Sequence, residues 1–253
     1  MEDRKRHTIK RIFRVLLIVV FWFAVWQGVS MIVNQSLFVP SVPETFSSLG
    51  GLVVTGEFWL SILMTLYRVV FGLVVAFVLG VSLAFLAAHA GIVEQLLRPL
   101  VTAVKSTPVM SIIVLALVWF NASYVPVFSC ILLCFPIFYA NTLGGIKSVE
   151  RNYLELAKVY HVRRVRVIRE VTIPSVLPNI YTALSIALGF SWKSVVAAEV
   201  LSSPKYSMGF NLYATKLYLD TPGLFAWTIA IIIISLIVER GLKRLLPTKG
   251  GAL

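Results

Sequence analysis

Residues 66–88 read LYRVVFGLVVAFVLGVSLAFLAA, an apolar stretch in which Arg68 is the only charged residue. A helix needs about 20 predominantly apolar residues to cross the hydrocarbon core of a bilayer. The stretch is long enough to do so, and no loop residue interrupts it. It therefore predicts a transmembrane helix and places the chain among membrane proteins.

The same stretch carries small residues at every fourth position: Gly72, Ala76, Gly80, Ala84 and Ala88. Residues four apart share one face of a helix. Lipid tails are as apolar as leucine, so helices associate in a bilayer through close backbone approach, which small residues permit. We expect this helix to pack centrally in a helical bundle.

Working outward, five further apolar runs predict a polytopic protein. With the first run they make six candidate spans: Ile12–Val33, Leu66–Ala88, Val101–Phe120, Val125–Ile146, Asn179–Leu201 and Pro222–Val238. The composition agrees, because 58% of the residues are hydrophobic and 13% are charged. In soluble domains about half of the residues are apolar and about a quarter are charged. The fold class predicted is all-α, with residues 1–253 as a single transmembrane domain. Pro108 is expected to kink the third span.

The net charge of +12 raises the question of nucleic-acid binding, and the distribution of the charge answers it. Of 23 lysines and arginines, 19 lie in alternate segments: 1–14, the loop after the second span, 147–178 and the tail. The opposite segments hold only Lys205 and Lys216. This asymmetry follows the positive-inside rule and predicts that both termini are cytoplasmic. The basic charge therefore orients the chain, and we expect no nucleic-acid partner.

Residues that would support catalysis or metal binding are scattered. Cys130 and Cys134 lie inside an apolar run, where such a pair is typical of small apolar packing, and the three histidines are far apart. Gly144–Ser148 ends like a phosphate-binding loop but lacks its spacing. We expect no cofactor, no metal and no enzymatic activity in this chain.

The segment 147–178 is too charged to cross a membrane, yet it has helical periodicity. Ser148–Tyr160 predicts one short helix with Ser148 as its N-cap. Val165, Ile168 and Val171 predict a second, which Pro174 and Pro178 should end. Two short amphipathic helices suit either docking on a partner protein or lying on anionic lipid.

Seven residues of this segment carry a resemblance to a known family: Glu155, Leu156, Ala157, His161, Val171, Ile173 and Pro174. Their spacing resembles the Glu-Ala-Ala loop of permease subunits of binding-protein-dependent ABC importers. In that pattern a glycine stands where this chain has His161, and histidine is less favourable than glycine where a turn requires positive φ. Phe38–Pro43 and Ser191–Glu199 look like the branch that imports sulfonates, taurine, nitrate and thiamine-precursor pyrimidines.

The resemblance implies a division of labour. The chain would form the translocation pathway for a small polar or anionic solute in a bacterial inner membrane. The 147–178 loop would be the coupling loop that contacts a cytoplasmic ATP-binding-cassette ATPase dimer. The implied partners include an extracytoplasmic binding protein and a second permease copy, a homodimer being the expected arrangement.

Charged residues inside the predicted spans need an explanation, because a charge at the bilayer centre costs about 2.5–3.5 kcal/mol on insertion scales. Trp192 and Glu199 share a helix face, whereas Lys193 and Glu199 point about 120° apart at 3.6 residues per turn. One interpretation places Trp192, Lys193 and Glu199 along the translocation pathway. The other has Lys193 snorkelling or paired with a carboxylate on another helix. Arg68, near the outer end of its span, is expected to anchor at the lipid headgroups.

Two other classes of protein remain as alternatives. A polytopic membrane enzyme would need catalytic groups clustered at one membrane depth, and the loops show no such cluster. A stand-alone channel or secondary transporter would need inverted repeats or broken helices with ion ligands, and the sequence shows no convincing internal repeat. An ATP-binding-cassette protein that co-purifies with the chain would distinguish the permease from both.

Overall fold

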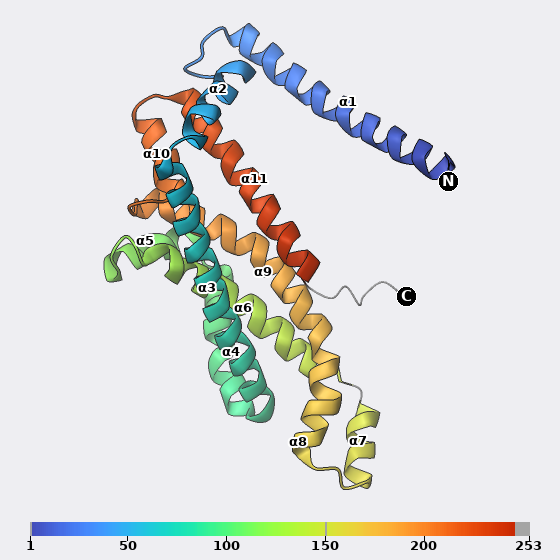
Figure 1. Ribbon diagram of the computed structural model, residues 1–253. Coiled ribbons are helices and arrows are strands. Elements are labelled where there is room, and N and C mark those ends of the chain that lie inside the picture. The colour runs from blue at the N-terminus through green and yellow to red at the C-terminus, as the bar shows by residue number, and fades with distance from the viewer. Residues whose placement is uncertain (1, 150, 246–253) are drawn as a thin grey trace. The chain divides into compact units, whose positions relative to one another are not determined.

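The computed structural model describes residues 2–149 and 151–245, and within these ranges every regular element is helical (Figure 1). The predicted all-α class is confirmed. The elements are α1 (Glu2–Val33), α2 (Val42–Val53), α3 (Gly56–His89), α4 (Gly91–Ser106), α5 (Val109–Trp119), α6 (Val125–Lys147), α7 (Arg151–Val159), α8 (Arg164–Val167), the π-helical turn η1 (Ile168–Thr172), α9 (Ile173–Ser202), α10 (Met208–Leu217) and α11 (Thr221–Leu245).

Five of the six predicted spans correspond to helices that are long and apolar enough to cross a membrane, and they lie in α1, α3, α6, α9 and α11. The third predicted span, Val101–Phe120, is not one helix. It is divided between α4 and α5, which are bent by 108° at Thr107 and Pro108. Proline cannot continue the hydrogen-bond ladder and forces the residue before it out of the helical region, so the kink expected at Pro108 is a full break.

The described chain divides into two compact units. The first comprises residues up to 59 together with 211–231. In it, the indole of Trp26 stacks on Phe225 at 5.6 Å between ring centroids and donates a hydrogen bond to the Pro40 carbonyl at 3.0 Å. Phe58 packs against Trp227 at 5.1 Å. These aromatic contacts join α1 to the first part of α11, and the start of α3 to the same helix.

The second unit comprises residues from 60 to 210 and the part of the chain from 232 onward. Its centre is the pair α6 and α9, which pack along each other and bury most of their facing side chains. Helix α3 approaches α6 through its small residues. A Cβ atom at Gly72 would lie 2.8 Å from Cys130 Cβ, and one at Gly80 would lie 2.6 Å from Phe138 Cβ. Ala76 and Ala84 are fully buried, so the stripe is a packing face, and the central place predicted for this helix stays a prediction.

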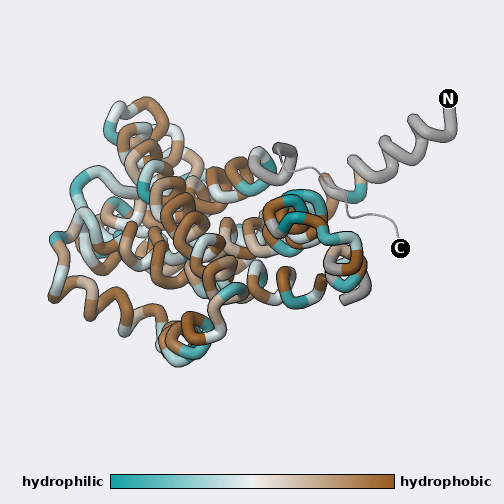
Figure 2. The backbone as a smooth tube through the Cα atoms, turned by 90° about the horizontal axis from the view of Figure 1, so that it is seen from below, coloured by the Kyte–Doolittle hydropathy of each residue, from teal (hydrophilic) through white to brown (hydrophobic). Residues whose placement is uncertain are grey.

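Apolar side chains also cover the outside of the helices. Figure 2 shows hydrophobic backbone positions along most helical segments, with hydrophilic positions gathered mainly at helix ends and connections. Large apolar side chains remain exposed on α1 and α5, such as Trp22 and Val118. Such a surface is unfavourable in water but costs nothing in hydrocarbon, which agrees with a multi-pass membrane protein.

Candidate functional site

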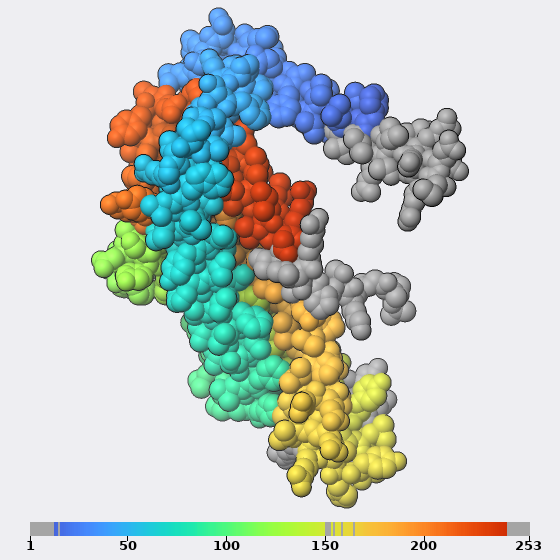
Figure 3. Space-filling model, viewed as in Figure 1, coloured from blue at the N-terminus to red at the C-terminus, as the bar shows by residue number. Residues whose placement is uncertain are grey.

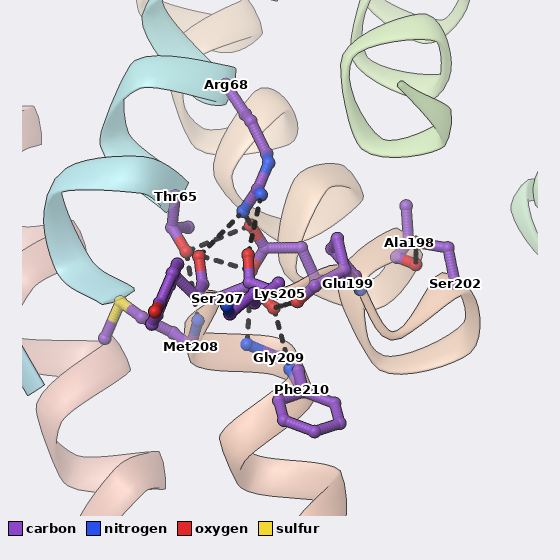
Figure 4. A network of polar contacts seen from close by, with 12 residues as sticks. Thr65, Arg68, Ala198, Glu199, Ser202, Lys205, Ser207, Met208, Gly209 and Phe210 are labelled. Atoms are coloured by element: carbon purple, nitrogen blue, oxygen red, sulfur yellow. Dashed lines mark hydrogen bonds and ion pairs between the residues drawn. The ribbon is translucent and has the colours of Figure 1, made fainter. Parts of the chain in front are cut away.

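A buried polar cluster lies where α9 ends. Glu199 in the last turn of α9 is fully buried, and Arg68 of α3 is 4% exposed. Figure 4 shows both side chains pointing toward one another and toward the connection between α9 and α10. The Arg68 guanidinium and the Glu199 carboxylate form an ion pair of 2.8 Å. Removing two charges from water costs several kcal/mol per ion, so such a pair needs further hydrogen bonds.

The remaining hydrogen-bonding capacity of the Glu199 carboxylate is met by two other donors. The Thr65 hydroxyl lies 3.0 Å from both carboxylate oxygens, and the backbone N–H of Gly209 donates to Oε2 at 3.1 Å. Thr65 Oγ1 also accepts the N–H of Met208 at 3.1 Å. The cluster therefore joins α3, α9 and the beginning of α10 in one network.

Arg68 holds a second set of groups. Its guanidinium donates to the carbonyls of Tyr206 at 3.2 Å and Lys205 at 3.3 Å. The expectation that Arg68 anchors at the lipid headgroups is therefore wrong. The reason is that Glu199 and two backbone carbonyls, all distant in sequence, satisfy the guanidinium inside the protein.

The predicted pathway residues of α9 divide between two faces. Trp192 is buried, as is Glu199, so the expected shared face is confirmed and is the packed face of the helix. Lys193 lies on the other face and is exposed. Among the described residues, the structure gives Lys193 no ion pair, and Glu199 is paired with Arg68. The role of these three residues in a pathway stays a prediction.

The 147–178 loop forms two helical pieces joined by a tight turn. Helix α7 ends with the N–H of Tyr160 bonded to the Leu156 carbonyl, and the N–H of Val162 bonded to the Ala157 carbonyl at 2.9 Å. Between them, His161 has φ 49°, which is the left-handed conformation. This is the Schellman arrangement, whose left-handed position is usually glycine. The turn at which the resembled loop pattern has glycine thus forms here with histidine.

Two expectations for the loop are wrong in detail. Ser148 is the C-cap of α6, and its hydroxyl donates to the Gly145 carbonyl, so it is not the N-cap of α7, which begins at Arg151. Pro174 and Pro178 do not end the second helix, because α8 runs through η1 directly into α9. Proline is tolerated in the first turn of a helix, and the π-helical turn before Pro174 changes the hydrogen-bond register. Pro178 lies inside α9.

The loop residues singled out by the resemblance lie mostly at the surface. Glu155, Leu156, His161, Ile173 and Pro174 are exposed, whereas Ala157 and Val171 are half-buried. A shallow pocket is lined by Tyr153, Glu170, Val171, Pro174 and Ser175. Figure 3 shows the loop, in yellow, as a protruding end of the second unit. Exposed apolar side chains beside charged ones are typical of a protein-docking surface.

No group of three or more metal-ligating side chains occurs among the residues that the structure describes. Cys130 and Cys134 are buried, and their sulfurs lie near the carbonyls of Val69 and Ala187. They fill space between α6 and its neighbours, as their spacing predicts.

Comparison with protein families decides the identity. The family described as the binding-protein-dependent transport system inner membrane component matches residues 76–249, which include α6, the 147–178 loop and α9. The chain belongs to this family. It is therefore the membrane component of a transport system that depends on a binding protein.

Several relatives of this inner membrane component are named as transport permeases. SsuC of Bacillus subtilis (strain 168), named for aliphatic sulfonates, is 27% identical over 237 residues, which cover 92% of this chain and 85% of the relative. TauC of Escherichia coli (strain K12), named for taurine, is 26% identical over 231 residues, which cover 87% of this chain and 82% of the relative. CmpB of Synechococcus elongatus, named for bicarbonate, is 29% identical over 66% of this chain and 60% of its own length.

Solved structures show the same fold. A bacterial ABC transporter that imports the polysaccharide alginate matches with a TM-score of 0.63 at 18% identity, over 97% of this chain and 100% of the other. An amino acid ABC transporter also matches with a TM-score of 0.63 at 16% identity, over 78% of this chain and 94% of the other. The inner membrane component therefore has an ABC permease fold.

Proposed function

We propose that this chain forms the transmembrane pathway of an ATP-driven importer and that the 147–178 loop docks on a cytoplasmic ABC ATPase dimer. The observation that carries the proposal is the protruding pair of helical pieces, which present exposed apolar side chains in a member of a permease family. The chain's own loops offer no phosphate-binding motif, so energy would come from the ATPase subunits.

The complete importer would hold two copies of this chain and an extracytoplasmic binding protein, in a bacterial inner membrane with both termini cytoplasmic. The substrate proposed is a small polar or anionic solute such as a sulfonate, taurine, nitrate or a thiamine precursor. Support comes from the names of SsuC and TauC and from the exposed ammonium of Lys193 on α9. The second copy is inferred from the family resemblance alone, in which six spans would form one half of a pathway.

Charge reversal in the loop tests the proposal. We expect Glu155→Lys to abolish co-purification of the ATPase and ATP-dependent uptake, while the protein stays inserted and folded. The matched control is Glu57→Lys, which reverses an exposed glutamate at the start of α3, on the predicted opposite side of the membrane. Normal ATPase association and uptake in Glu155→Lys would contradict the proposal, as would an equal loss in both variants.

The pairing and the pathway are tested separately. Chemical cross-linking in native membranes should recover a dimer of this chain, and recovery of monomers alone would contradict the homodimer.

Lys193→Ala should reduce uptake of an anionic substrate severely and leave assembly intact. Unchanged uptake would remove Lys193 from the pathway and leave it as a snorkelling side chain.

A further inference from the structure

The polar cluster and the coupling loop lie at opposite ends of the same helix. Helix α9 begins at Ile173, inside the loop, and continues to Ser202, with Glu199 in its last turn. The 25 residue-to-residue steps from Pro174 to Glu199 correspond to about 38 Å at 1.5 Å per residue. A displacement of the loop can therefore be transmitted to Glu199 through one continuous helix.

The segment that follows α9 is held in an unfavourable conformation. Ser203 and Tyr206 both have left-handed backbone angles, with φ 50° and 53°. Residues other than glycine adopt this conformation at an energetic cost and keep it where surrounding contacts determine it. Here those contacts come from α3, because Arg68 binds the carbonyls of Lys205 and Tyr206, and Thr65 accepts the N–H of Met208.

The far end of the segment is tied to α9 by close packing as well as by hydrogen bonds. Gly209 donates its N–H to Glu199, and a Cβ atom at this position would lie 2.5 Å from Glu199 Cβ and 2.6 Å from the Val196 carbonyl oxygen. The segment 203–209 is therefore attached to α9 at both ends, and to α3 through Thr65 and Arg68. Figure 4 shows this arrangement, with α3 on one side and the connection on the other.

We propose that Thr65, Arg68 and Glu199 are positioning residues that make the segment 203–209 follow α9 when the coupling loop moves, so that ATP binding on one side of the membrane changes the exposure of this segment on the other. The inference rests on the proposed function. Without the three side chains, the segment loses its hydrogen bonds to α3 and keeps the bond from the Ser203 N–H to the Glu199 carbonyl and the packing of Gly209.

Two conservative substitutions separate positioning from charge balance. Arg68→Lys keeps the positive charge beside Glu199 but replaces a planar fork of donors with a single ammonium, which cannot span the carboxylate and two carbonyls in the same way. Thr65→Val keeps the shape and removes the hydroxyl that links Glu199 to Met208. The matched control is Thr142→Val on α6, because Thr142 is equally buried and its hydroxyl has no hydrogen-bond partner among the described residues.

The experiment measures the exposure of the segment directly. Lys205 is exposed, its ammonium lies 4.8 Å from the centroid of the Tyr206 ring, and only its backbone carbonyl is hydrogen-bonded to Arg68. Lys205→Cys keeps that carbonyl, so it is a suitable reporter. The native Cys130 and Cys134 are fully buried, so a membrane-impermeant maleimide should react with the introduced cysteine. The permease–ATPase complex in lipid vesicles is labelled without nucleotide and again with ATP and vanadate, and association of the ATPase is checked in each sample.

We expect the labelling rate of Lys205→Cys to change at least about threefold between the two nucleotide conditions, and Thr142→Val to keep that change. Adding Thr65→Val or Arg68→Lys should reduce the change to less than about 1.5-fold while the ATPase stays associated. The inference would be overturned if both variants kept the nucleotide-dependent change in labelling rate. It would also be overturned if the labelling rate of the parent Lys205→Cys protein did not depend on nucleotide. Loss of the assembled complex in both variants would also overturn it, since the cluster would then be purely stabilising. If the parent chain binds no ATPase at all, the proposed function itself fails.

Discussion

The polar residues at the two ends of helix α9 differ in burial. At one end, Glu199 and Arg68 are buried and the carboxylate receives hydrogen bonds from Arg68, Thr65 and Gly209. At the other end, the residues around His161 and Pro174 are exposed and carry apolar side chains such as Leu156 at the surface. The first region is complete within the chain, whereas the second has a surface suited to a partner.

This difference predicts that substitutions in the two regions differ in their effect on stability. A buried charge is costly when its partner is removed, since the charge left behind is neither paired nor solvated. An exposed loop carries little of the folding free energy, so substitutions there act mainly on association. Removing a buried charge should therefore lower stability strongly, whereas substitutions at the exposed end should act on ATPase binding and transport with little effect on stability.

The largest effect is expected when one member of the buried pair is removed. Glu199→Ala leaves the Arg68 guanidinium buried without its counter-charge and should lower the free energy of unfolding by about 3–5 kcal/mol. The double variant Arg68→Met with Glu199→Met removes both charges and should lose less than the single variant. Thermal unfolding in detergent, followed by size-exclusion chromatography, measures both. A double variant that is no more stable than Glu199→Ala would show that the charges themselves are not what makes the single change costly.

The next effect concerns the packing beside the pair. Gly209→Ala places a methyl group against Glu199 Cβ and the Val196 carbonyl, so it should cost about 1–3 kcal/mol of unfolding free energy through overpacking. Gly189→Ala on α9 is the matched control, because a Cβ atom there meets nothing within 4 Å. Its expected change is a small gain from the higher helix propensity of alanine. Equal stability of the two variants in the same unfolding assay would contradict the tight fit at Gly209.

A smaller effect is expected at the turn of the loop. His161→Gly relieves a left-handed histidine but adds freedom to the unfolded chain, so the gain should be at most about 1 kcal/mol. Uptake should stay near that of the wild type. His161→Val places a β-branched residue at the same φ and should weaken ATPase association, measured by co-purification. If His161→Val binds the ATPase normally, the shape of this turn does not matter for docking.

The smallest effect on stability is expected at the exposed face of α7. Leu156 is 52% exposed, so Leu156→Ser should change the unfolding free energy by less than about 0.5 kcal/mol. The same change should nevertheless reduce ATPase association, because it removes an apolar contact from the proposed docking surface. A large loss of stability in Leu156→Ser would remove the contrast between the two ends of α9.

The sequence by itself determined the class of the protein and most of its helices. Apolar length predicts a span wherever about 20 residues can satisfy their own backbone in lipid, which is a local property. The small-residue stripe of α3 is also local, since four-residue spacing places its members on one face, and Gly72 and Gly80 do meet α6. The family resemblance of Glu155 to Pro174 could be read from order and spacing alone.

Only the tertiary structure decided the partners of the charges and the course of the chain at its prolines. Arg68 and Glu199 are 131 residues apart, and nothing in either neighbourhood specifies the other. Pro108 breaks its helix, whereas Pro174 and Pro178 lie within α9, because the hydrogen bonds lost at a proline depend on the backbone around it. Burial, pairing and helix continuity are properties of packed neighbours, so a linear sequence determines them only through the fold.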